Sequence, residues 1–256
     1  MKVYTTEIAS DRLTSDNPIH QRLFKAYVAA KPFIKGKLLE LGCGEGRGID
    51  ELAPLADQYT GVDKLSEVVD KLKNKFPSHR FESGMFPPVP FPDNSFDTIV
   101  TFQVIEHVQN DDLFVKELYR VLRPGGTALI TTPNIKMTLS RNPWHVREYT
   151  STELTNLCLK HFELVEMKGI AGNEKVMQYY ERNKTSVNKI TKYDFLDLQH
   201  RLPAPLLRIP YDLLNRLNRN GLQKEADELV KSIHYDDYEL KDEDQQNLDL
   251  FVVLKK

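Results

Sequence analysis

A glycine-rich segment and a carboxylate 19 residues after it are the residues whose types and spacing point most clearly to chemistry. Gly42, Gly44 and Gly46 lie in the segment Glu40–Gly48, directly after a run that reads as a strand. Glycine lacks a Cβ, so a ligand can approach the backbone closely there. Asp63 ends the next predicted strand, 19 residues after Gly44. In a parallel α/β sheet both positions face the crevice at the carboxyl ends of the strands, where a carboxylate can bind the hydroxyls of a ribose.

The residues of this loop distinguish two classes of ligand. Dinucleotides use G-x-G-x-x-G, in which the third glycine allows close packing of helix on strand and the helix N-terminus binds pyrophosphate. The sixth position here is Arg47, so the observed pattern is G-x-G-x-G. Glu40 and Glu45 would repel a pyrophosphate, whereas they suit a ligand that carries an amino group and a sulfonium.

Taken with three further motifs, this loop resembles that of the class I S-adenosylmethionine-dependent methyltransferases. The motifs occur in the order found in that family and cover about residues 33–170 together with the last strand. They are the glycine-rich motif Leu38–Gly48, the acidic ribose motif Gly61–Asp63, the segment Phe91–Asp97 that runs into Thr98–Val108, and the turn Leu122–Thr127 that leads to Thr132–Asn134.

The resemblance implies a doubly wound, mostly parallel α/β sheet of seven strands in the order 3-2-1-4-5-7-6, with the last strand antiparallel. It also implies S-adenosylmethionine (SAM) as the cofactor. Many relatives carry an acidic residue near the adenine, whereas this sequence has Met85 there, followed by Phe86. Both are alternatively ordinary core residues. The cofactor-binding residues that the resemblance implies are Glu40, Gly42, Cys43, Gly44, Gly46, Asp63, Lys64, Met85, Phe86, Phe102 and Gln103.

Two histidines are candidate catalytic bases. SAM carries an activated methyl group, so the protein has to hold the acceptor in line with it and exclude water. A hydroxyl acceptor also has to lose its proton, and histidine is the residue best matched to neutral pH. His107 follows the fourth predicted strand in the pair Glu106-His107, and His145 follows the fifth strand. The alternative for His107 is a contact with the cofactor or with loop backbone.

Residues near His145 are candidates for binding the acceptor, because this region often lines the acceptor site in the family that the sequence resembles. Arg147 and Tyr149 could anchor a polar acceptor, and Trp144 could pack against it. The alternative is a structural loop that docks on the following helix.

A metal site at the end of the fourth strand is a further alternative. Some relatives place Glu-x-x-Glu-His there and bind a divalent ion with another histidine. This sequence has Gln103 in place of the first glutamate, and an amide is a poor substitute for a carboxylate ligand. Glu106, His107 and His145 could still supply three ligands, but we expect no metal.

Two classes of methyl acceptor can be excluded because the motifs that they require are missing from this sequence. The exit of the fourth strand, Phe102–Ile105, lacks the Asn-Pro-Pro-Tyr type of motif used on nucleobase amines, and no cysteine pair is placed to attack a pyrimidine. We therefore expect a small-molecule or lipid-linked acceptor, methylated at oxygen, and no DNA. A SAM-binding interaction module without turnover and an RNA methyltransferase are the alternatives, and the near-neutral charge of the chain disfavours RNA.

The elements that must position these residues follow from a regular alternation of strands and helices, which predicts a mostly parallel sheet covered on both faces. An N-terminal helix is expected over residues 17–31, with Pro18 in its first turn. Strands are expected at 37–41, 58–62, 80–82, 98–102, 127–132 and 162–168, and helices at 46–55, 64–75, 111–122 and 151–159.

The alternation breaks after residue 170 and resumes with a last strand at 248–254. We therefore expect three parts. They are an N-terminal helical segment (1–32), a SAM-binding domain (33–170 plus 248–256) and a helical insert (171–247).

The insert is expected to form a cap over the acceptor pocket. A partner or dimer surface is one alternative, and a peripheral membrane contact through the basic amphipathic stretch 206–219 is another. Pro203, Pro205 and Pro210 argue against a single long helix there. The acidic segment 236–244 is expected to be a solvated loop.

Composition sets the remaining limits. The chain has 256 residues, with 35 Lys and Arg against 37 Asp and Glu, a balance that argues against a surface built as a whole to bind nucleic acid or anionic lipid. Two cysteines, Cys43 and Cys158, exclude a disulfide scaffold. No apolar run approaches the length of a transmembrane helix, and residues 1–16 lack the apolar core of a secretory signal. We expect a cytoplasmic protein that is a monomer or a homodimer.

Overall fold

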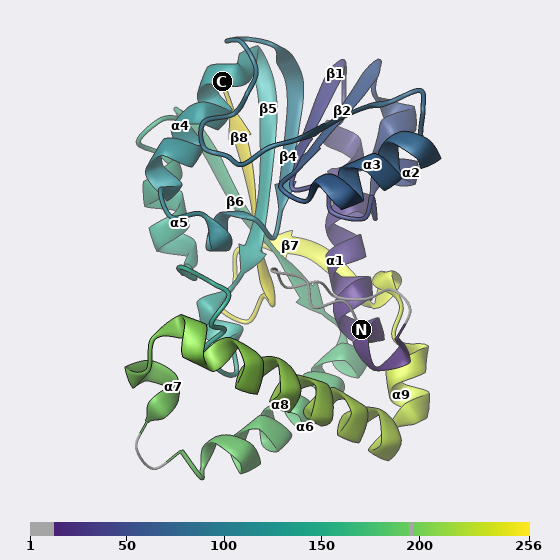
Figure 1. The fold of residues 1–256 in the computed structure, drawn as a ribbon, viewed down its shortest axis with the longest axis vertical. Helices are drawn as coiled ribbons and strands as arrows, with labels where there is room; N and C mark the ends of the chain where they lie inside the picture. The colour runs from purple at the N-terminus through teal and green to yellow at the C-terminus, as the bar shows by residue number, and fades with distance from the viewer. Residues whose placement is uncertain (1–12, 195–196) are drawn as a thin grey trace.

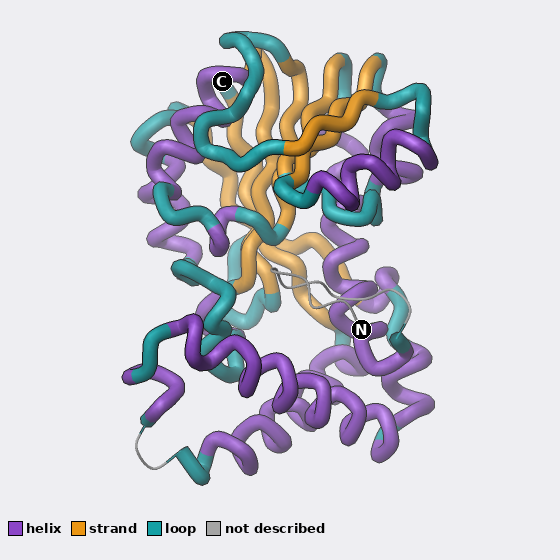
Figure 2. The backbone as a smooth tube through the Cα atoms, viewed as in Figure 1, coloured by secondary structure: helices purple, strands orange, loops and turns teal. Residues whose placement is uncertain are grey.

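The computed structural model describes residues 13–194 and 197–256, which form one mixed β-sheet with helices on both faces (Figures 1 and 2). The sheet has the order β3-β2-β1-β4-β5-β8-β6-β7. The first five strands in this order, β3, β2, β1, β4 and β5, are parallel to one another. Strand β8 runs antiparallel to both of its neighbours, β5 and β6. The strands are β1 Lys37–Leu41, β2 Gln58–Asp63, β3 Arg80–Ser83, β4 Phe96–Phe102, β5 Leu122–Pro133, β6 Leu164–Gly172, β7 Tyr238–Asp242 and β8 Asp249–Lys255.

The prediction of seven strands in the order 3-2-1-4-5-7-6 is wrong by one strand. The extra strand, β7, pairs antiparallel with the outer edge of β6 and lies inside the acidic segment 236–244 that we expected to be a loop. Tyr238 is buried and Leu240 half-buried, whereas the residues between and after them are exposed. This alternation gives the segment one apolar face, and its exposed charges are typical of an edge strand.

Two groups of helices cover the sheet (Figure 1). One face packs against α1, α2, α3 and part of the insert, and the other packs against α4 and α5. The central strands are buried on both faces, which explains their nearly continuous apolar sequences. The helices are α1 Asn17–Ala30, α2 Ile49–Leu52, α3 Ser66–Lys75, α4 Asp111–Val121, α5 Ser151–Cys158, α6 Glu174–Thr191, α7 Leu198–Arg201, α8 Ala204–Glu225 and α9 Asp227–Ser232.

The N-terminal helix is confirmed as α1, and the first twelve residues of the expected segment 1–32 lie outside the described residues. The helix expected over 46–55 is much shorter. Only α2 is α-helical there, because the chain between β1 and α2 turns through left-handed glycines, Gly42 at φ +82° and Gly46 at φ +84°.

The single long helix that the prolines argued against does form, as α8. Pro203 lies at the N-cap and Pro205 in the first turn, where the missing N–H would have no helical partner in any case. Only Pro210 is interior, so the helix loses one hydrogen bond there. The membrane contact that was one alternative for this stretch stays untested. None of the helices in the described chain combines the length and apolar character needed to cross a bilayer.

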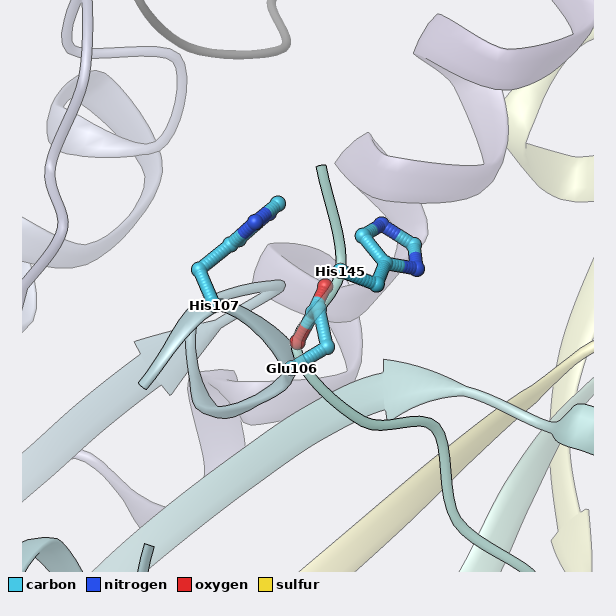
Figure 3. Close-up of side chains that lie close together, drawn as sticks. All are labelled: Glu106, His107 and His145. Carbon is cyan, nitrogen blue, oxygen red and sulfur yellow. The ribbon is translucent and has the colours of Figure 1, made fainter. Parts of the chain in front are cut away.

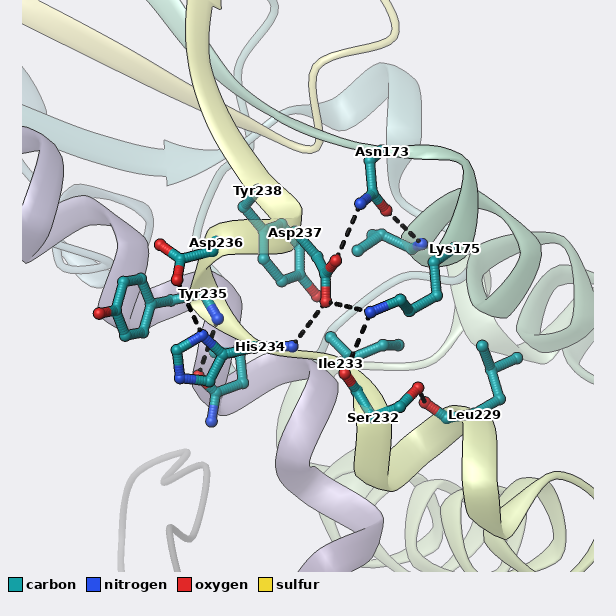
Figure 4. Close-up of polar contacts among 12 residues, drawn as sticks. Asn173, Lys175, Leu229, Ser232, Ile233, His234, Tyr235, Asp236, Asp237 and Tyr238 are labelled. Carbon is teal, nitrogen blue, oxygen red and sulfur yellow. Dashed lines mark hydrogen bonds and ion pairs between the residues drawn. The ribbon is translucent and has the colours of Figure 1, made fainter.

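One carboxylate joins the first residues of the insert to the segment just before β7 (Figure 4). Asp237 accepts hydrogen bonds from Asn173 Nδ2 at 2.9 Å, from Lys175 Nζ at 2.7 Å and from the backbone N–H of His234 at 2.9 Å. Burial alone would raise the pKa of this carboxyl, but these donors hold it below its ordinary value. The start of α6 is thereby joined to the start of β7.

Candidate active site

A cavity of about 760 Å³ opens at the carboxyl ends of β1, β2, β3 and β4. This volume lies in the upper part of the range of about 300–1,000 Å³ for small-molecule sites. Its walls are the loop after β1, the end of β2, the segments after β3 and β4, and one face of α1. The two motifs that the spacing pointed to, at Gly42–Gly46 and Asp63, therefore meet in one pocket.

Asp63 is held in place by the backbone on both of its carboxylate oxygens. Oδ2 accepts from the N–H of Gly44 at 2.9 Å, and Oδ1 accepts from the N–H of Leu65 at 3.0 Å. The residue is 9% exposed and lines the pocket. Each carboxylate oxygen can accept a second hydrogen bond, so Asp63 is oriented by the protein and still able to bind a ligand hydroxyl.

The glycine loop presents bare backbone to the cavity. Gly44 has φ +49°, and a Cβ built on it would meet no atom within 4 Å, so this position faces open space. At Gly42 a Cβ would lie 2.3 Å from Val104 Cγ2, so that glycine permits close packing within the protein instead. The Gly42 and Cys43 N–H groups both donate to the Val62 carbonyl, at 2.8 and 3.1 Å.

Glu40 does not line the cavity and lies beneath the loop. It is 1% exposed, and its carboxylate accepts from Tyr27 Oη at 2.9 Å and from Tyr59 Oη at 2.5 Å. Burial raises the pKa of Glu40 to about 7, although the two tyrosine hydroxyls oppose this shift. Tyr27 does line the cavity, so Glu40 acts on the pocket wall through that tyrosine.

The other residues proposed for the cofactor all line the cavity. Met85 is 84% exposed, which excludes the core role considered for it, and Phe86 stacks on Phe114 with ring centroids 5.7 Å apart. Burial raises the pKa of the Cys43 thiol, so it is not a reactive thiolate. The lining residues among those proposed are Gly42, Cys43, Gly44, Gly46, Asp63, Lys64, Met85, Phe86, Phe102 and Gln103.

Sequence reasoning missed the contribution of α1 to the pocket. His20, Leu23, Phe24 and Tyr27 lie on the face of α1 that lines the cavity. Their spacing of three and four residues marks one face of a helix, which was the available signal. Which wall that face would meet depends on how α1 packs, and the sequence pattern does not contain this information.

His107 lines the cavity, from the short 3₁₀ turn after β4 (Figure 3). Its Nδ1 lies 2.9 Å from the carbonyl oxygen of Trp144. His145 is beside it, with ring centroids 4.9 Å apart in an edge-to-face arrangement, but does not line the cavity. The Nδ1 of His145 contacts Glu148 Oε1 at 2.7 Å, and its Nε2 contacts Asn142 Nδ2 at 2.9 Å.

Glu106 lies beside the two histidine rings (Figure 3). Its carboxylate is buried and accepts from Thr132 Oγ1 at 2.9 Å. Burial raises the pKa of Glu106 to about 7. One potential ligand atom from each of Glu106, His107 and His145 lies within 4.8 Å of the others. Both ring nitrogens of His145 already have protein partners, so a cation here would have to displace one of them, and the absence of a metal stays a prediction.

The structure places the three residues proposed for the acceptor away from the cavity wall. Tyr149 is fully buried and donates through its hydroxyl to Asp111 Oδ2 at 2.8 Å. Arg147 lies over the Tyr149 ring and pairs with Asp111 at 3.2 Å. Trp144 donates from Nε1 to Asp212 Oδ1 of α8 at 3.0 Å. These contacts fit the structural loop that was the alternative for this segment.

Known proteins that are similar to this chain include methyltransferases. Residues 39–130 match the family described as a methyltransferase domain. A probable S-adenosylmethionine-dependent methyltransferase of Mycolicibacterium smegmatis is 40% identical over 140 residues, which cover 52% of this chain and 54% of that protein. A fatty-acid O-methyltransferase of the same organism is 35% identical over 108 residues, which cover 40% of this chain and 39% of that protein. The chain spans about half the length of the curated relatives it matches.

The fold is shared with solved structures over nearly the whole chain. A SAM-dependent methyltransferase of Thermotoga maritima, described as a possible histamine N-methyltransferase, has a TM-score of 0.60 at 15% identity and covers 93% of this chain and 91% of that one. At this identity the likeness shows the fold alone. Residues 39–130 thus match a methyltransferase domain, the relatives include probable S-adenosylmethionine-dependent methyltransferases, and the fold is that of a solved SAM-dependent methyltransferase.

Proposed function

We propose that this protein transfers the methyl group of SAM to an oxygen of a small-molecule or lipid-linked acceptor. One observation carries the proposal. The backbone N–H of Gly44, a residue with open space where a Cβ would be, donates to Asp63 Oδ2 at 2.9 Å, and both residues line one large cavity. A carboxylate suits a ribose diol, and a glycine with open space beside it suits a ligand that lies against the chain. The residues present therefore fit the cofactor.

SAM when bound supplies an activated methyl group on a sulfonium, so the chain's own residues have to bind the cofactor, position the acceptor and accept its proton. Asp63 and the loop Gly42–Gly46 would hold the cofactor, and Met85 and Phe86 would lie toward its base. His107 is the proposed base, since it lines the cavity while its partner His145 lies behind it. General base catalysis typically contributes about 10²- to 10⁴-fold.

An apolar acceptor is supported by the wall that α1 contributes. Leu23 and Phe24 line the cavity from α1, and Leu113 lines it from α4. A relative that matches part of this chain is named a fatty-acid O-methyltransferase. Apolar side chains favour an acceptor with a hydrocarbon portion because burying it removes apolar surface from water.

We also propose that the insert caps the acceptor side of the pocket. Its helix α8 contacts the loop next to His107 through Asp212 and Arg208, both of which meet Trp144. Arg141 of the same loop donates to the carbonyl of Gln199 in α7 at 2.7 Å.

Isothermal titration with SAM tests the cofactor half of the proposal. We expect micromolar to submicromolar binding, and no heat at millimolar SAM would refute it. Incubation with SAM labelled in its methyl group and a panel of hydroxy and carboxy lipids tests the acceptor half. Binding of SAM without label transfer to any extracted metabolite would favour the alternative, a SAM-binding module without turnover.

A further inference from the structure

The hydrogen bond between His107 and Trp144 determines which ring nitrogen of His107 carries the proton. Nδ1 of His107 lies 2.9 Å from the Trp144 carbonyl oxygen. A carbonyl oxygen only accepts hydrogen bonds, so Nδ1 must be the protonated nitrogen. In the neutral ring the lone pair is then on Nε2. In water a neutral imidazole prefers the opposite arrangement, so the protein selects this tautomer.

Asn142 holds the backbone on the other side of Trp144, at the peptide group that precedes the one whose carbonyl meets His107. It is 7% exposed, and its Oδ1 accepts from the backbone N–H of Trp144 at 3.0 Å. The next turn of this loop is anchored beside His107, because the N–H of Val146 donates to the Glu106 carbonyl at 2.7 Å. The carbonyl that meets His107 is therefore placed by a buried side chain and by main-chain contacts.

The orientation of the Asn142 amide follows from its partners. Because a backbone N–H only donates, Oδ1 must face Trp144, and Nδ2 must face Nε2 of His145 at 2.9 Å. His145 then carries its proton on Nδ1, which donates to Glu148 Oε1 at 2.7 Å. These contacts require a proton on Nδ1 of His107 and a proton on Nδ1 of His145.

We propose that Asn142 is a positioning residue that, through the Trp144 carbonyl, fixes the Nδ1-protonated tautomer of His107, so that Nε2 accepts the proton of the methyl acceptor. This inference rests on the proposed function. The insert contacts the side chain of the same residue, because Asp212 accepts from the Trp144 indole and Arg208 lies 4.5 Å from its ring. Glu106, Glu148, the Asn142 amide and the Trp144 carbonyl are among the groups beside the two imidazoles.

The proposed step balances as follows. The acceptor oxygen forms a bond to the methyl carbon as the bond from that carbon to sulfur breaks, and the electron pair of the broken bond stays on sulfur. The proton of the hydroxyl passes to Nε2 of His107, which becomes an imidazolium. The imidazolium then returns the proton to water through the open cavity.

Nitrogen-15 NMR of the full chain tests the tautomer directly. Two-bond proton–nitrogen spectra of histidine-labelled protein at about pH 8, where imidazole is neutral, distinguish protonated from unprotonated ring nitrogens. The chain has seven histidines, and a His107→Gln variant assigns the signal. We expect a protonated Nδ1 and an unprotonated Nε2 for His107 in the unmodified protein. A protonated Nε2 in the signal assigned to His107 would overturn the inference.

Two substitutions at Asn142 separate positioning from folding. Asn142→Ala removes the acceptor for the Trp144 N–H, and we expect a mixture of His107 tautomers. We expect kcat to fall about tenfold, a part of the general-base contribution, while the dissociation constant of SAM changes less than about twofold. Asn142→Asp keeps an oxygen toward Trp144, so it should restore the His107 tautomer even though it disturbs His145.

Asn247→Ala is the matched control. Asn247 is also a buried asparagine, with its Nδ2 donating to the Asp242 carbonyl at 3.0 Å, and it lies just before β8, packed against Gly169 of β6. It should lower stability without changing the His107 signal. An unchanged tautomer in Asn142→Ala, or an equal change in Asn247→Ala, would overturn the inference. Failure of SAM to bind the unmodified protein would instead refute the proposed function and leave the tautomer measurement valid.

Discussion

The two ends of the pocket are built in different ways. The cofactor end, Gly42–Leu65, is a short stretch of chain in which backbone N–H groups of the loop and of Leu65 hold the Asp63 carboxylate. The acceptor end joins His107 to the loop Asn142–Glu148, which is 35 residues further along, through side-chain contacts. Main-chain contacts survive most substitutions, whereas each side-chain contact depends on one residue. The acceptor end should therefore be the more sensitive to substitution and the place where specificity is set.

The largest effect is expected from removing the base at the acceptor end. His107→Ala should lower kcat about 100-fold or more because the acceptor loses its proton acceptor. The SAM dissociation constant, measured by titration calorimetry, should stay nearly unchanged. His161→Ala is the control, since His161 is half-buried and contacts Asp112 outside the cavity. Full turnover by His107→Ala on the true acceptor would show that the base lies elsewhere.

The cofactor end is broken by Asp63→Ala. The ribose loses charge-assisted hydrogen bonds, so SAM binding should weaken by about 1–3 kcal/mol. Asp57→Ala removes an exposed carboxylate just before β2 and should leave binding unchanged. An unaltered dissociation constant for Asp63→Ala would mean that the ribose is held by other groups and that the two ends do not differ as described.

Two glycine substitutions sharpen the description of the cofactor end. Gly44→Ala places a Cβ in the open cavity at φ +49°, which should cost about 1–2 kcal/mol of stability and also weaken SAM binding by occupying the pocket. Gly42→Ala places a Cβ against Val104 and should lower the melting temperature further than Gly44→Ala. If Gly44→Ala binds SAM as tightly as the unmodified protein, the cofactor does not lie against this glycine.

The smallest effect is expected outside the pocket, at the carboxylate that joins the first residues of the insert to the segment just before β7. Asp237→Asn should lower the free energy of unfolding by about 1 kcal/mol at neutral pH, because the charge-assisted bond from Lys175 is lost. SAM affinity should not change. A loss of SAM binding would show that the insert affects the cofactor end, which would contradict the description of that end as a stretch held by its own backbone.

The stability difference between Asp237→Asn and the unmodified protein should depend on pH and disappear in acid. The pKa of Asp237 is held below its ordinary value in the folded chain, so its stabilising contribution is present above the unfolded pKa of about 3.9. That contribution is lost as the pH falls through the lower folded pKa. Denaturant titrations of Asp237→Asn and the unmodified protein should therefore differ at pH 7 and converge in acid. A constant difference down to the acid limit would contradict this account.

Strand β7 and helix α8 show why part of the fold escaped prediction. Their local patterns are ambiguous: the acidic segment around Asp237 reads as a loop by charge, and the stretch around Pro210 reads as broken by its prolines. In the structure β7 is stabilised by pairing with the outer edge of β6. Helix α8 is stabilised by packing against α6 and the short 3₁₀ turn Thr14–Asp16. Long-range pairing of this kind overrides local propensity.

The residues whose placement depends on local chain geometry could be brought together from the sequence alone. Gly44 and Asp63 face each other because parallel strands β1 and β2 end at the same edge, and this follows from their order and spacing. Tertiary structure decided which residues complete the pocket. It brought Tyr27 and the rest of its α1 face into the wall, and it turned Trp144, Arg147 and Tyr149 away from the cavity. The physical reason is that contacts between segments distant in sequence are set by how whole elements pack, and the spacing of residues within one segment does not determine that packing.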